Sequence, residues 1–244
     1  MPLGAPAAAR RPLSWPDRAR AMAYAKFMLT FYVLFFPAYF GTRHLIPAHA
    51  ATWQLFFEWE TSIPLVPWMI WPYLSLYSLF CVPLFQATAE EIEALAKRTA
   101  FVLVVGGICF VILPGRIGFP KVDDLGMHQA LFDLLRAFDQ PGNLVPSLHV
   151  TFSMLILHAA AQVATSRLRA FYIAWLCAML VSVVAVHQHH LIDVAVGIAL
   201  ALVAGYLFPA KVAYQAKNED DGNEARDFGL RVAPPGELTC SGPG

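Results

Sequence analysis

Long apolar runs, separated by short polar connections, occupy most of this chain. A helix needs about 20 apolar residues to cross the hydrocarbon core of a bilayer. Runs that approach this length cover residues 27–41, 65–85, 99–113, 147–164, 170–186 and 191–208. This pattern predicts an all-α integral membrane bundle of about six transmembrane helices.

Polar segments flank the apolar region on both sides. Residues 1–25 are rich in Ala, Pro and Arg, and we expect them to form a cytoplasmic amino-terminal segment. Residues 26–210 form the predicted six-helix membrane domain. Residues 211–244 combine acidic side chains with a Pro-Pro-Gly run, a composition that predicts a disordered cytoplasmic tail.

Composition supports a membrane protein and argues against other classes. The chain is 58% hydrophobic and only 14% charged, and its mean hydropathy is +0.54. A formal net charge of zero offers no electrostatic basis for binding nucleic acid. The four cysteines have no paired spacing that predicts a disulfide framework or a zinc site.

Basic residues predict the orientation of the bundle, since short cytoplasmic loops retain Lys and Arg. If the runs cross alternately, 13 of the 17 basic residues fall on one side. The opposite side keeps only Arg43, Arg116, Lys121 and Arg136. Both termini are therefore predicted to be cytoplasmic, and the loops near 115–145 and around His187 face outward from the cytoplasmic membrane.

Two polar motifs border the apolar runs on that outer side. Residues 143–149 read Asn-Leu-Val-Pro-Ser-Leu-His, and residues 187–193 read His-Gln-His-His-Leu-Ile-Asp. Ionisable groups are costly at a membrane, so they are candidates for function. Pro146 suits the first position of a helix. A helix that begins there would offer free N–H groups and the Ser147 hydroxyl to a phosphate.

The second motif has the spacing of an activated histidine. His189 and Asp193 are four residues apart, so on a helix they share a face, and the carboxylate can orient one imidazole nitrogen. The other nitrogen is then free to act as a nucleophile. His149 is the candidate general acid. Arg116 and Lys121, from the preceding outer loop, are the candidate phosphate-binding cations.

The outer loop also predicts a helix of its own. Leu131, Leu134, Leu135 and Phe138 form an apolar stripe at helical spacing. Such a helix would either lie in the membrane interface and admit a lipid sideways, or cap the bundle. The sequence leaves both interpretations open.

These motifs resemble the type 2 phosphatidic acid phosphatase superfamily of membrane lipid phosphatases and phosphotransferases. Residues 146–149 match its Pro-Ser-Gly-His motif with Leu in place of Gly, while Ser182, His189 and Asp193 fall at the spacing of its third motif. Val183 replaces the arginine of that motif, and the first motif is not intact. The Pro-Ser-Leu-His form is similar to the inositol phosphorylceramide synthase branch, which transfers headgroups between lipids.

The resemblance implies a phosphohistidine on His189, oriented by Asp193, with His149 protonating the leaving group. It implies a lipid phosphate or diphosphate as substrate, with water as the acceptor or, alternatively, a lipid alcohol, and it implies no cofactor and no metal. Two other classes of site stay open from the residues alone. A metal site could use His187, His189 and Asp193. A transporter or proton relay is the non-enzyme alternative, and it would need polar residues at mid-membrane depth or broken helices.

Overall fold

The computed structural model describes residues 10–46, 52–138 and 142–210. Within these ranges the regular secondary structure is helical. Two isolated β-bridges occur there, and no β-strand. The all-α class predicted from the apolar runs is therefore confirmed for this part of the chain. The tail predicted at 211–244 lies outside the described residues.

Within the described ranges, three helices are long and apolar enough to cross a membrane. The first, Arg18–Gly41, consists of α1 (Arg18–Phe35) and a π-helical turn, η1 (Phe36–Gly41). The other two are α6 (Ala89–Ile112) and α10 (Ser166–Ala185). They coincide with three of the six predicted runs.

Side-chain caps explain where two of these helices begin. The Asp17 carboxylate accepts a hydrogen bond from the Arg20 N–H, so α1 starts inside the segment 1–25 rather than at the apolar run. Thr88 and Glu91 form a reciprocal capping box at the start of α6. Both helices thus extend beyond the apolar residues by one or more polar turns.

The remaining apolar runs form shorter helices. The run 65–85 is broken into η3 (Pro67–Met69), α3 (Ile70–Leu74), α4 (Leu76–Leu79) and α5 (Val82–Gln86). Proline has no N–H to donate, so Pro72 and Pro83 prevent a continuous hydrogen-bond ladder here. The run 147–164 forms α8 (Leu148–Ser153), η5 (Met154–His158) and α9 (Ala159–Val163), and the last run forms α11 (Leu191–Leu207).

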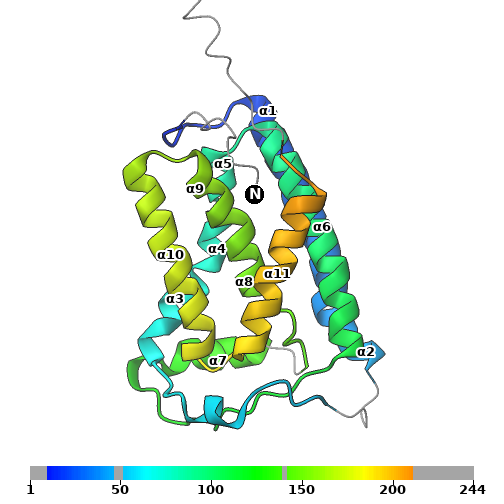
Figure 1. Cartoon of the computed structure of the whole chain (residues 1–244), viewed down its shortest axis with the longest axis vertical. Helices are drawn as coiled ribbons and strands as arrows, with labels where there is room; N and C mark the ends of the chain where they lie inside the picture. Colours follow the sequence, from blue (N-terminus) through cyan, green and yellow to red (C-terminus); the bar gives the residue numbers. More distant parts are fainter. Residues whose placement is uncertain (1–9, 47–51, 139–141, 211–244) are drawn as a thin grey trace, which may run out of the picture. The chain divides into compact units, whose positions relative to one another are not determined.

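Figure 1 shows α1 and α6 side by side along one edge of the bundle, with α10 at the opposite edge and α8, α9 and α11 between them. Four short elements complete the described structure: α2 (Thr42–Leu45), η2 (Glu58–Ser62), η4 (Gly126–His128) and α7 (Gln129–Phe138). Helix α7 lies across the end at which α6 and α10 finish and α11 begins (Figure 1). We call this the α7 end.

Aromatic side chains hold the central helices together. The Phe31 ring of α1 lies 4.7 Å from Phe80 and 5.5 Å from Phe152, measured between ring centroids. Phe152 also packs edge-on against Phe80. Such aromatic pairs are each worth about 0.5–1.5 kcal/mol beyond the area they bury. They fix α8 against α1 and the segment α3–α5.

The helix predicted in the outer loop is present as α7, but its apolar stripe divides between two faces. Leu131 and Leu135 pack on a buried cluster that contains Phe132, whereas Leu134 and Phe138 are exposed. Helix α7 therefore caps the bundle with one face and presents apolar side chains outward with the other. Both roles considered for the stripe are compatible with this arrangement.

The charge pattern predicts that the α7 end faces outward. Asp124, just before η4, and Ser166, the first residue of α10, are both exposed, so each can be tested by labelling. In a chain whose four native cysteines are replaced by alanine, we expect Asp124→Cys to react with an impermeant maleimide added to intact cells. Ser166→Cys should react only after the membrane is opened. The reverse pattern would place the α7 end in the cytoplasm.

Candidate functional site

A small cavity at the α7 end brings the two candidate catalytic histidines together. Its volume is about 20 Å³, and its walls are formed by Tyr39, Tyr73, Phe110, Asn143, Leu144, Leu148, His149, Gln188 and His189. These residues come from five separate segments of the chain. A volume of this size accommodates about one water molecule.

The segment before α8 differs in detail from the expected helix start. Helix α8 begins at Leu148 rather than Pro146, because Ser147 is the cap and its hydroxyl accepts from the Val150 N–H at 3.4 Å. The Ser147 side chain is fully buried and does not line the cavity. Its hydroxyl thus has a structural partner already, and its proposed contact with a phosphate stays a prediction.

His149 lies in the first turn of α8 with its ring stacked on Tyr73. The two ring centroids are 4.0 Å apart and the planes differ by 17°. The Nε2 atom of His149 is buried and has no hydrogen-bond partner among the described residues. A buried polar atom without a partner is costly, and this cost falls when a water or a ligand in the cavity bonds to it.

His189 and Asp193 are brought together as predicted, although not by a shared helical face. His189 precedes α11, which begins at Leu191, and its backbone N–H donates to the Val183 carbonyl at 3.0 Å. The distance from His189 Nδ1 to Asp193 Oδ2 is 3.4 Å, an ion-pair distance longer than a good hydrogen bond. Catalytic contacts of this kind often tighten when substrate binds.

Asp193 also fixes the start of α11. It is 1% exposed, and its Oδ2 accepts from the backbone N–H of His190 at 2.8 Å. Its own carbonyl accepts from the Ser147 N–H at 3.1 Å, which ties the cap of α8 to the first turn of α11. Asp193 therefore lies beside the candidate nucleophile and joins the two helices α8 and α11.

Glycine permits the close approach of α8 and α11. A Cβ on Gly197 would lie 2.8 Å from the Ser147 carbonyl oxygen and 3.2 Å from Thr151 Oγ1. The Thr151 hydroxyl lies 2.8 Å from the Ser147 oxygen and 3.1 Å from the Gly197 oxygen, close enough to donate to either. The helices touch backbone to backbone here, and this contact sets the position of His149 relative to His189.

Arg116 and Lys121 lie outside the cavity. Arg116 is exposed and donates to Gln54 Oε1, and Lys121 pairs with Asp123 at 3.0 Å, with both side chains largely in solvent. Neither cation lines the walls around His149 and His189. Val183, at the position of the missing arginine, is fully buried in an apolar cluster. The role of Arg116 and Lys121 in holding phosphate stays a prediction.

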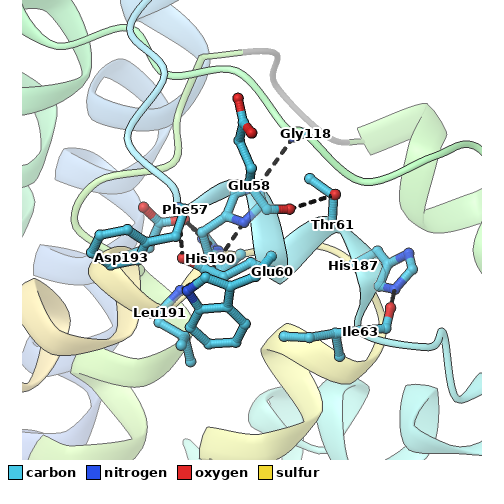
Figure 2. Close-up of polar contacts among 12 residues, drawn as sticks. Phe57, Glu58, Glu60, Thr61, Ile63, Gly118, His187, His190, Leu191 and Asp193 are labelled. Atoms are coloured by element: carbon cyan, nitrogen blue, oxygen red, sulfur yellow. Dashed lines mark hydrogen bonds and ion pairs between the residues drawn. The ribbon is translucent and has the colours of Figure 1, made fainter.

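A buried carboxylate missed by the sequence analysis lies next to this site. Glu60, in η2, is fully buried and lies 3.3 Å from His190 Nδ1 (Figure 2). The motifs considered from the sequence include no residue of this segment. The signal that could have revealed it is a carboxylate inside an aromatic segment at the membrane edge, which is costly unless it is paired.

His187 and His190 belong to an aromatic stack rather than to the cavity. The Phe119 ring lies between them, at 4.1 Å from His187 and 4.3 Å from His190, and Phe56 covers the other face of His190. His187 Nε2 lies 2.9 Å from the Ile63 carbonyl. Among the residues the structure describes, no group of three or more His, Cys, Asp and Glu side chains has the arrangement of a metal site.

Comparisons with known proteins add no relative. No protein-family model matches the chain, and no curated protein and no solved structure matches it.

The close contact between α8 and α11 at Gly197 can be tested by substitution. We expect Gly197→Ala to lower stability by about 1–3 kcal/mol, the usual effect of overpacking, and to reduce activity by moving His149. Gly205→Ala in the same helix is the matched control, because its Cβ would meet nothing within 4 Å. That change should be neutral or stabilising by up to about 1 kcal/mol. Thermal unfolding in detergent measures both variants, and equal effects would contradict the close contact.

The buried histidines predict a pH dependence of stability. Desolvation lowers the pKa of His190 and of His187 below the ordinary value of 6.5, although Asp193 and Glu60 oppose the shift at His190 and the Ile63 carbonyl opposes it at His187. The unfolded chain therefore binds these protons first as pH falls. The stability they confer is complete above 6.5 and is lost as pH falls through the folded pKa values.

We expect a lower unfolding temperature at about pH 5 than at about pH 7.5. A chain carrying His187→Gln and His190→Gln should be less stable at neutral pH but should show a smaller difference between the two conditions. An unchanged difference in this double variant would show that other groups cause the pH dependence.

Proposed function

We propose that this chain is a membrane lipid phosphatase that cleaves a lipid phosphate or diphosphate through a phosphohistidine on His189. The observation that carries the proposal is that His149 and His189 line one cavity while Asp193 Oδ2 lies 3.4 Å from His189 Nδ1. A nucleophile, its orienting carboxylate and a proton donor are the groups that such a reaction requires.

The reaction follows from these three side chains. His189 Nε2 attacks phosphorus, the bond from phosphorus to the lipid oxygen breaks, and His149 gives a proton to that oxygen. Water then attacks the phosphohistidine, the phosphorus–nitrogen bond breaks, and His149 takes the proton of the water. Asp193 stabilises the positive charge that develops on His189 in the first step.

Substrate binding has to widen the site. The cavity holds about one water molecule, whereas a phosphoryl group with its oxygens is several times larger. We infer that the side chains around His149 and His189 move apart when the headgroup enters. Arg116 is the candidate cation to follow the headgroup, since its exposed side chain lies on the loop that contacts the start of α11 through Gly118.

We further infer that six membrane-spanning segments surround this site, with both termini in the cytoplasm and the α7 end at the outer face. Three helices long enough to span, two shorter apolar helices and the broken segment α3–α5 supply the six. The motif residues precede or begin α8 and α11 at the α7 end, whereas α1, α6 and α10 begin at the opposite end (Figure 1). Arg18 and Arg20 lie in the first turn of α1, Arg167 and Arg169 lie in the first turn of α10, and Lys97 and Arg98 lie about two turns into α6.

The roles of the two histidines can be separated by substitution. His189→Ala removes the attacking atom, so both turnover and a covalent phosphoenzyme should disappear. His149→Ala removes the proton donor and should reduce turnover of a lipid phosphate by about 10²–10⁴-fold. A nitrophenyl phosphate, whose leaving group needs no proton, should recover most of that loss. Acid quenching with a ³²P-labelled substrate measures the phosphoenzyme.

His44→Ala, at an exposed position in α2, is the control and should retain wild-type activity. Near-normal turnover by His189→Ala, or the absence of an acid-labile phosphoenzyme in the wild type, would contradict the mechanism. Adding a lipid alcohol distinguishes the acceptor, because release of free phosphate indicates hydrolysis and a new phospholipid indicates transfer.

A further inference from the structure

Glu60 joins its own segment to the start of α11, 130 residues away in the sequence. Its Oε1 accepts from the Phe57 N–H at 3.0 Å, and its Oε2 accepts from the Leu191 N–H at 2.9 Å. The same Oε2 lies 3.3 Å from His190 Nδ1 (Figure 2). A carboxylate that is fully buried is costly unless such donors surround it.

The protons on the His190 ring follow from its partners. His190 Nε2 accepts a hydrogen bond from the Gly118 backbone N–H at 3.0 Å, so Nε2 carries no proton. In a neutral imidazole the proton is then on Nδ1, which donates it to Glu60. Phe56 and Phe119 stack on the two faces of the ring and prevent it from rotating.

Two carboxylates hold His190, one at its side chain and one at its backbone. Glu60 binds its side chain and Asp193 binds its backbone N–H, and Asp193 also faces the His189 ring. His189 is the residue before it, and its backbone N–H is tied to the Val183 carbonyl. A displacement of His190 would therefore also displace His189, the candidate nucleophile.

We propose that Glu60 is a positioning residue for His189. Glu60 fixes the ring of His190 and accepts from the Leu191 N–H at the start of α11. It thereby keeps the His189 imidazole beside Asp193 and at the cavity that His149 also lines. This inference rests on the proposed function for its catalytic consequence, although the contact of Glu60 with His190 can be tested without it.

Glu60→Gln is the sharpest substitution because it keeps the shape and removes one acceptor. The amide has one oxygen and one NH₂ group, and in either orientation the NH₂ group faces an N–H donor, at Phe57 or at Leu191. Glu58, two residues earlier and exposed, gives the matched control Glu58→Gln.

The first measurement is independent of activity. In ¹⁵N-histidine-labelled protein in detergent, imidazole nitrogen shifts distinguish a protonated from a bare nitrogen, and the His190 signals are assigned by their loss in His190→Gln. We expect the Nδ1–H form in the wild type and in Glu58→Gln, and a mixture of forms in Glu60→Gln. An Nε2–H form in the wild type, or a spectrum unchanged by Glu60→Gln, would overturn the proposal.

The second measurement separates positioning from mere folding. We expect Glu60→Gln to lower kcat about 10- to 100-fold, the size of effect seen when a hydrogen-bond partner that orients a metal-binding histidine is removed, with a smaller change in KM. The burst of phosphoenzyme, which counts active sites, should keep its amplitude while its rate falls. A reduced amplitude with an unchanged rate per site would show that Glu60 only stabilises the fold.

A double substitution tests whether Glu60 acts through His190. If it does, Glu60→Gln combined with His190→Gln should lower kcat no more than the larger single effect. If the two reductions in kcat multiply in the double variant, Glu60 acts by another route, and the proposal is overturned. A wild type that lacks phosphatase activity but shows the expected His190 spectrum would refute the proposed function alone.

Discussion

The contact between the start of α8 and the first turns of α11 determines the geometry of the site. The Ser147 N–H donates to the Asp193 carbonyl, and Gly197 lets the two backbones meet where any larger residue would separate them. Small residues commonly allow helices to approach in a bilayer, where apolar burial between helices gives little driving force. Here the approach does more than pack, since His149 is carried by one helix and Asp193 by the other.

Buried polar groups around this contact are arranged so that one group satisfies several partners. Asp193 accepts from a backbone N–H and faces an imidazole, and Glu60 accepts from two backbone N–H groups and a second imidazole. Sharing of this kind offsets the desolvation of the carboxylates. The shared hydrogen bonds also restrain the turn between α10 and α11, because breaking any one of them leaves Asp193 or Glu60 with fewer donors around its buried charge.

The helical class could be predicted from the sequence, because hydropathy is a local signal. The closeness of His189 and Asp193 was expected for a different reason than the structure gives, since His189 lies in the turn before α11 and shares no helical face with Asp193. The break in the run 65–85 was missed, since an average over apolar residues does not register Pro72 and Pro83. Glu60 was missed for a different reason. Its partner His190 is 130 residues away, and no local pattern connects them. Arg116 was chosen for its charge, but its hydrogen bond to Gln54 depends on a loop contact that only the structure shows.

The broken segment α3–α5 has a consequence for the order in which the protein assembles. At the break between α3 and α4 the Ser75 hydroxyl donates to the Pro72 carbonyl, and the Trp175 indole of α10 donates to Ser75 at 2.9 Å. Polar backbone inside a bilayer is tolerated only where protein covers it. Trp175 follows Ser75 by 100 residues in the chain. In the proposed bundle the polar groups at this break are therefore fully covered only once α10 is in place, so that a late helix completes an early one.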